Sequence, residues 1–179
     1  CVELLGGVIA AQPLFRPYRG YSERPANVTY VHADARAHLV RTDAIYDIIF
    51  TDGRTPEVIG GYEFLTREFV EICAARLSPD GVVGMLLSWP SESETTFTLM
   101  NTLFTRFEWV AVAESLPLVF AGNGDYLPPL TSDTIVHRDE WERDGMIDLT
   151  GVLTDDRPDL MFEALRRVRE ARKKSVLVW

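Results

Sequence analysis

Three acidic side chains follow short segments that the sequence predicts to be β-strands. Glu3 closes the first segment, and Asp34 comes shortly after Val28–His32. Asp52 follows the apolar run Tyr46–Thr51 directly. Because the carboxyl ends of parallel strands meet at one edge of a sheet, we expect these carboxylates to face one crevice. Carboxylates placed there can accept hydrogen bonds from ribose hydroxyls or an adenine amino group, and they can hold a cationic centre.

The same acids have a plain structural alternative. Asp52 precedes Gly53, and Asp-Gly pairs are common in turns for purely local reasons. Asp52 could equally cap a helix, and all three acids could be unrelated loop carboxylates. Their shared position at strand ends favours the ligand-facing cluster.

Other reactive residue types form no recognisable site. His32, His38 and His137 have no metal-ligand spacing with each other or with Cys1 and Cys73. No Walker motif or G-x-S-x-G motif is present. Cys73 lies on the apolar face of a predicted helix, so we expect it in the core. The sequence therefore predicts no metal site.

Composition indicates a soluble globular protein. Hydrophobic residues make up 46% of the chain and charged residues 25%. The length of 179 residues suits one domain spanning residues 1–179. No apolar run approaches the roughly 20 residues of a membrane helix. Two cysteines are too few for a disulfide framework and favour a reducing, cytoplasmic compartment. The net charge of −9 disfavours nucleic acid and favours cationic ligands, although the segment 166–179 is basic.

Strand and helix patterns alternate along the chain. Together they predict an α/β, Rossmann-like, doubly wound sheet that is mostly parallel. An antiparallel hairpin at one edge is expected from 108–114 and 117–122. The region 123–157 is less regular, with a helical turn at 138–144. The remaining predicted elements are strands at 28–32, 46–51 and 81–88 and helices at 4–15, 36–41, 66–77 and 93–107. In the helix 93–107, Phe97 is expected to face inward. A final helix is predicted to begin at Pro158, with Asp155 or Asp156 as its N-cap.

Several motifs together resemble the polyamine aminopropyltransferases, the spermidine synthase family. The ending Leu153–Pro158 resembles that of synthase-like domains fused to membrane transporters. The other motifs that carry the resemblance are Val2-Glu3-Leu4, Ala33-Asp34-Ala35-Arg36, Tyr46–Asp52, Tyr62–Phe69 and Leu77–Val82.

The resemblance implies a class I methyltransferase-like fold and a set of residue roles. Glu3 would bind the ribose of an S-adenosyl ligand, and Asp34 and Ala35 would hold its adenine. Asp52 would accept a proton from the attacking amine, and Asp52 and Thr55 would contact that amine substrate. The co-substrate would be decarboxylated S-adenosylmethionine or S-adenosylmethionine, without a metal. The chain would be cytoplasmic or the soluble domain of a membrane protein, and a homodimer is left open.

The sequence also departs from the family pattern. The family's Gly-rich loop precedes the strand that ends at Glu3, so we expect the chain to be a fragment that lacks it. Thr55 stands where the family usually has a second aspartate, which puts putrescine in doubt as the substrate. We therefore expect the fragment to be weakly active or inactive. The alternatives are a methyltransferase on the same fold and a non-catalytic binding or assembly domain.

Overall fold

The structure is a computed structural model that forms two compact units, Cys1–Asp43 and Ala44–Trp179, each of which is described by itself. The single domain expected over 1–179 stays a prediction. The structure describes residues 1–18, 28–52, 61–87, 94–113, 118–125, 133–145 and 152–156.

The first unit is built on two short parallel strands. β1 (Val2–Glu3) pairs with β2 (Val31–His32), so Glu3 lies beside His32. The helix expected over 4–15, with Pro13 and Pro17 closing it, ends as an α-helix at Ala11 and continues as a 3-10 helix, because proline has no N–H to continue an α-helix. The helices of this unit are α1 (Gly6–Ala11), the 3-10 helix η1 (Gln12–Tyr18) and α2 (Ala35–Arg41).

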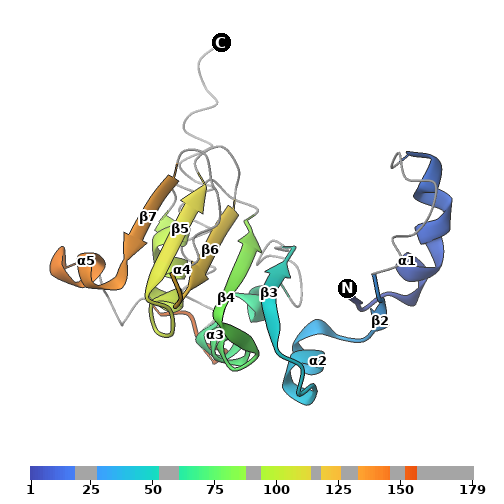
Figure 1. The fold of residues 1–179 in the computed structure, drawn as a ribbon, viewed down its shortest axis with the longest axis horizontal. Helices are drawn as coiled ribbons and strands as arrows, with labels where there is room; N and C mark the ends of the chain where they lie inside the picture. The colour runs from blue at the N-terminus through green and yellow to red at the C-terminus, as the bar shows by residue number, and fades with distance from the viewer. Residues whose placement is uncertain are drawn as a thin grey trace, which may run out of the picture. The chain divides into compact units, whose positions relative to one another are not determined.

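The second unit is built on a five-stranded sheet with the order β3-β4-β6-β5-β7 (Figure 1). β3 and β4 are parallel, and the other neighbouring pairs are antiparallel. β3, β4 and β5 therefore run in one direction, while β6 and β7 run in the other. The strands are β3 (Tyr46–Thr51), β4 (Leu77–Leu86), β5 (Trp109–Ala113), β6 (Leu118–Gly122) and β7 (Asp133–His137), and the helices are η2 (Tyr62–Phe64), α3 (Arg67–Ala74), α4 (Glu94–Leu103) and α5 (Arg138–Arg143).

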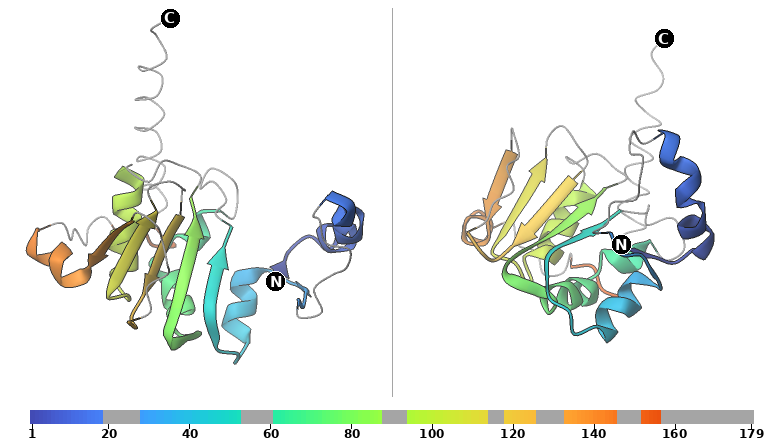
Figure 2. Two further views of the ribbon diagram at one scale, coloured as in Figure 1. Left: turned by 45° about the horizontal axis from the view of Figure 1, so that its top comes forward. Right: turned by 45° about the vertical axis from the view of Figure 1, so that its right-hand side comes forward.

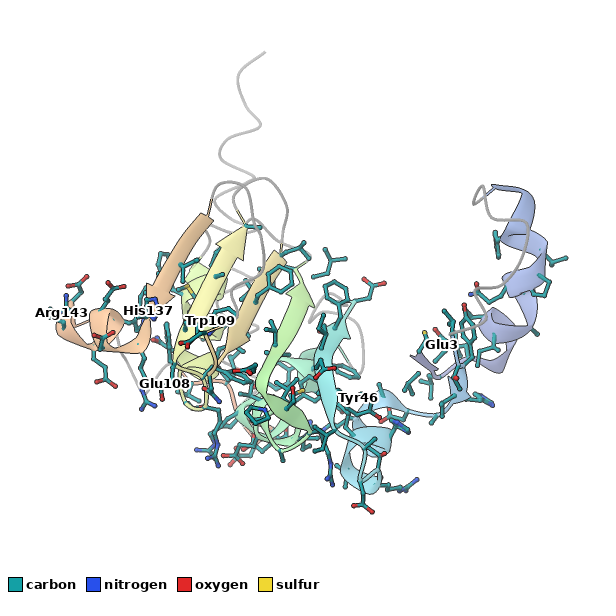
Figure 3. All side chains as sticks on the ribbon, viewed as in Figure 1. Glu3, Tyr46, Glu108, Trp109, His137 and Arg143 are labelled. Atoms are coloured by element: carbon teal, nitrogen blue, oxygen red, sulfur yellow. The ribbon has the colours of Figure 1, made fainter. Side chains whose placement is uncertain are left out.

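One face of this sheet is covered by α3 and α4 (Figures 1 and 2). Alternation along the strands places Ile49, Val83 and Val119 on one face, and all three are buried. Cys73 of α3 is fully buried, which confirms its predicted place in the core. On the opposite face, a second cluster is centred on Trp109, which lies beside His137 of β7 (Figure 3).

The prediction that Tyr46–Thr51 is a buried strand is wrong for most of its length. Among the residues that the structure describes, β3 pairs with β4 alone, and within β3 only Ile49 is buried. Ile48 and Phe50 are exposed. An apolar run shows that side chains are suited to burial, but it does not show that a neighbouring strand is present to cover them.

The expected hairpin is confirmed as the antiparallel pair β5 and β6. The sheet continues past it, because β7 pairs with β5 and β6 lies between β4 and β5. The edge strand on this side is therefore β7, in a region that looked irregular. Phe97 also differs from its prediction, since it is half-exposed and stacks on Trp141 instead of entering the core.

β4 begins before the predicted strand. Tyr46 pairs with Leu77 and Ile48 pairs with Val82, so residues 78–81 bulge out of the register. The helix predicted at 66–77 ends at Ala74, because Leu77 already belongs to β4. The helix predicted from Pro158 lies outside the described residues. Within the described ranges, no helix has the length and apolar character needed to cross a membrane.

Candidate functional site

Glu3 ends β1 in the first unit (Figure 3). Its Oε1 accepts a hydrogen bond from the Leu5 N–H at 2.8 Å, just before α1 begins. His32 Nε2 donates to the Leu4 carbonyl at 3.0 Å. A Cβ added at Gly6 would lie 3.1 Å from the His32 ring, so this glycine permits the close approach. The end of β1 is thus held against β2 by both backbone and side chains.

Asp34 is the N-cap of α2. Its Oδ1 accepts a hydrogen bond from the Ala37 N–H at 2.7 Å. This bond satisfies one of the N–H groups left open at a helix start. Ala35 is the first residue of this helix. The role of helix cap that was considered for Asp52 is therefore found at Asp34, although the cap uses only one of its two carboxylate oxygens.

The structure brings Glu3 and Asp34 to the same edge of the first unit. β1 and β2 are parallel, and the Glu3 carbonyl accepts from the Ala33 N–H at 3.1 Å. Each carboxylate follows the carboxyl end of its strand, as the sequence predicts. The hydrogen bonds described above use one oxygen of each carboxylate, Glu3 Oε1 and Asp34 Oδ1. The pair can therefore accept further hydrogen bonds from a ligand.

Asp52 belongs to the second unit and is exposed directly after β3. Its position at the carboxyl end of a strand agrees with the sequence analysis. Its place in one crevice with Glu3 and Asp34 stays a prediction, and Thr55 lies outside the described residues. Over the described part of the chain, no group of His, Cys, Asp and Glu side chains is arranged to hold a metal ion.

The segment 152–156 holds the beginning of α3. Leu153 is fully buried, and its carbonyl accepts from the Arg67 N–H at 2.8 Å. Its own N–H donates to Thr102 Oγ1 of α4 at 3.0 Å. The Tyr62 hydroxyl donates to the Thr154 carbonyl at 2.6 Å. This segment therefore joins α3, α4 and the residues before α3.

Sequence reasoning missed this arrangement. Tyr62–Phe69 and Leu153–Pro158 were both singled out as motifs, but nothing in either motif indicated contact with the other. The only local signal was Thr66, a good N-cap residue placed before an apolar helix. In the structure, Thr66 Oγ1 accepts from the Phe69 N–H at 3.4 Å, so Thr66 is the N-cap of α3.

Comparison with known family models and with curated proteins gave no match. Solved structures match in fold. A probable spermidine synthase from Corynebacterium glutamicum ATCC 13032 superposes with a TM-score of 0.57 at 17% identity, covering 86% of this chain and 61% of that one. Human methyltransferase-like protein 13, in complex with SAH, superposes with a TM-score of 0.51 at 13% identity, covering 92% of this chain and 69% of that one. MNMC2 from Aquifex aeolicus superposes with a TM-score of 0.50 at 16% identity, covering 88% of this chain and 50% of that one.

These likenesses define the class of fold. The chain is an α/β protein of the Rossmann-like, methyltransferase type, as the sequence predicts. At identities of 13% to 17%, the superpositions show the fold alone. The chain spans 61% of the length of the Corynebacterium protein.

Proposed function

We propose that this chain is part of a spermidine synthase-like transferase that binds an S-adenosyl ligand. The observation that carries the proposal is the pairing of Glu3 and Asp34 at one sheet edge, in a fold shared with a probable spermidine synthase. Glu3 holds the ribose hydroxyls, and Asp34 with Ala35 holds the adenine. The acceptor-only chemistry of the two carboxylates suits the hydroxyl and amino donors of adenosine.

The reaction we propose is aminopropyl transfer to a polyamine-type amine. When bound, decarboxylated S-adenosylmethionine supplies a carbon made electrophilic by the neighbouring sulfonium. As the amine nitrogen bonds to that carbon, the carbon–sulfur bond breaks and the sulfur leaves as a neutral thioether, while Asp52 accepts the proton that the amine loses. Its negative charge also stabilises the ammonium form of the amine before attack. With Thr55 in place of a second aspartate, one ionic contact to a diamine is lost, because threonine carries no charge.

A methyltransferase on the same fold is the second candidate. It is favoured by the superposition on human methyltransferase-like protein 13 and by Thr55 in place of a second acid. In this case the ligand is S-adenosylmethionine itself. Its methyl carbon is then the transferred group.

Ligand binding by titration calorimetry separates these candidates. Decarboxylated S-adenosylmethionine, S-adenosylmethionine and S-adenosylhomocysteine are titrated into the chain and into its Glu3→Gln, Asp34→Asn and Asp52→Asn variants. Tighter binding of the decarboxylated ligand supports aminopropyl transfer, and tighter binding of S-adenosylmethionine supports methyl transfer. Failure of all three ligands to bind contradicts the proposal and leaves a binding or assembly domain.

The substitutions are chosen to keep the structural hydrogen bonds. Asp34→Asn keeps a side-chain oxygen that can cap α2, but it sets an amide N–H₂ against the adenine amino group. We expect this change to weaken binding by about 10- to 100-fold, the range for losing one charge-assisted hydrogen bond. Asp43→Asn is the matched control, since Asp43 is exposed in the same unit and follows no strand. Asp52→Asn should leave adenosyl binding unchanged and lower transfer in an aminopropyl-transfer assay.

A further inference from the structure

One peptide group lies between the His32 ring and the Glu3 carboxylate. This group joins Leu4 to Leu5. Its carbonyl oxygen accepts a hydrogen bond from His32 Nε2 at 3.0 Å, and its N–H donates to Glu3 Oε1 at 2.8 Å. Because a carbonyl oxygen can only accept, Nε2 of His32 carries the proton. The imidazole, the peptide group and the carboxylate therefore form one continuous chain of hydrogen bonds.

The geometry of a peptide group links the two ends of this chain. The described residues contain no cis peptide bond, and in a planar trans group the carbonyl and the N–H point in opposite directions. Holding the Leu4 carbonyl against His32 therefore fixes the direction of the Leu5 N–H on the other side. A hydrogen bond to the carbonyl also polarises the group and strengthens its N–H as a donor. His32 thus acts on the Glu3 carboxylate through the peptide group.

The His32 ring is itself held in place. His32 of β2 lies beside Glu3 of β1 in the parallel register. A Cβ added at Gly6 would lie 3.1 to 3.5 Å from three atoms of the ring, so the ring packs against the first residue of α1. Gly6 is not among the described glycines with a positive φ. Glycine at this position is therefore required for the space it leaves to the ring.

We propose that His32 is a positioning residue for the adenosyl ligand, because it holds the Leu4–Leu5 peptide group and thereby directs the remaining carboxylate oxygen of Glu3 toward the ribose hydroxyls. The identity of the ligand rests on the proposed function, whereas the chain of hydrogen bonds does not. Since Glu3 is ordered before the ligand arrives, binding loses less side-chain entropy. Loss of the His32 donor should therefore weaken ligand binding.

The first test follows amide hydrogen exchange by NMR in the absence of ligand. The Ala37 N–H, which donates to Asp34 Oδ1 at 2.7 Å, is the internal reference. His32→Leu should speed exchange of the Leu5 N–H by about tenfold, the effect of losing one hydrogen bond, and leave Ala37 unchanged. His32→Gln should restore the original rate, because the glutamine amide nitrogen lies the same number of bonds from Cβ as His32 Nε2 and can also donate.

Gly6→Ala tests the same contact without changing His32. The added methyl group should displace the ring and speed exchange of the Leu5 N–H by a smaller factor, although alanine favours a helix more than glycine does. If His32→Leu does not fold, this variant decides the outcome. The absence of any rise at Leu5 would overturn the proposal. So would an equal rise at Leu5 and Ala37, because His32 would then stabilise the unit as a whole.

The second test measures binding of S-adenosylhomocysteine by calorimetry in two double-mutant cycles. His32→Leu should weaken binding by about tenfold. This loss should disappear in a Glu3→Ala background and keep its full size in an Asp34→Asn background, because His32 acts through Glu3. Equal losses in both backgrounds would overturn the positioning role. If the unsubstituted chain binds no S-adenosyl ligand, the proposed function fails, and the exchange rates still decide whether His32 positions Glu3.

Discussion

Thr66 Oγ1 donates a hydrogen bond of 2.6 Å to Asp155 Oδ1, although the two residues are 89 positions apart in the sequence. Thr66 is fully buried and is also the N-cap of α3. The Asp155 N–H returns a bond to Glu68 Oε2 at 3.0 Å. The first turn of α3 is thus fixed from outside the helix by the segment 152–156.

Removing the Thr66 hydroxyl should destabilise the second unit. Thr66→Val keeps the shape but loses the bond to Asp155 and the N-cap of α3. We expect a loss of about 1–3 kcal/mol in the free energy of unfolding, measured by denaturant titration. Thr66→Ser is the control, since it keeps the hydroxyl and should lose much less. Equal losses in the two variants would show that the methyl group carries the effect.

The Trp141 indole should couple to Asn101. Trp141 Nε1 donates to Asn101 Oδ1 at 2.8 Å, and both side chains are buried. Trp141→Phe leaves the amide oxygen without this donor, so we expect a loss of about 1–3 kcal/mol in unfolding free energy. In a double-mutant cycle with Asn101→Leu, the double variant should lose less than the two single losses combined. Simple additivity would contradict a direct coupling.

A side chain at Gly84 should strain the sheet. A Cβ there would lie 2.8 Å from the Phe50 ring and 2.9 Å from the Phe120 ring. Gly84→Val should therefore lower the free energy of unfolding by about 1–3 kcal/mol, the range for overpacking. Phe50→Ala should partly restore stability in the Gly84→Val background, because it removes one of the two clashing rings. A variant as stable as the original chain would show that the rings move aside freely.

Two substitutions of Asp34 should distinguish its role as a helix cap from its proposed role in ligand binding. Asp34→Ala removes the bond to the Ala37 N–H. This loss should cost about 1 kcal/mol of stability, as typical N-cap deletions do. Asp34→Asn should leave stability nearly unchanged, since asparagine caps helices about as well as aspartate. Thermal unfolding of both variants without ligand is the measurement. A large loss for Asp34→Asn would indicate a structural need for the charge.

Local patterns in the sequence were sufficient for several elements. The helices predicted at 36–41 and 66–77 are present as α2 and α3, and each begins within one residue of its predicted start. The β-branched and apolar run at Tyr46–Thr51 forms a strand, and Cys73 on an apolar helix face is buried. These predictions hold because helix starts, strand propensity and periodicity depend on residues within a few positions of one another.

The sequence alone also placed Glu3 and Asp34 correctly at strand ends. Only the tertiary structure showed that these strands pair and that each carboxylate already serves a backbone N–H. The same holds for the exposure of Ile48 and Phe50, the place of β7 beyond the hairpin, and the contact of Phe97 with Trp141.

Thr66 and Asp155 illustrate the physical reason for this division. Both residues are of types that commonly cap helices. A residue type alone does not predict a hydrogen-bond partner that lies 89 positions away in the sequence. Strand order and long-range hydrogen bonds follow from how whole elements pack together, and burial of the same apolar run depends on which neighbour covers it. The chain's own residues therefore determine which elements form, while their packing decides which side chains are buried, capped or left exposed.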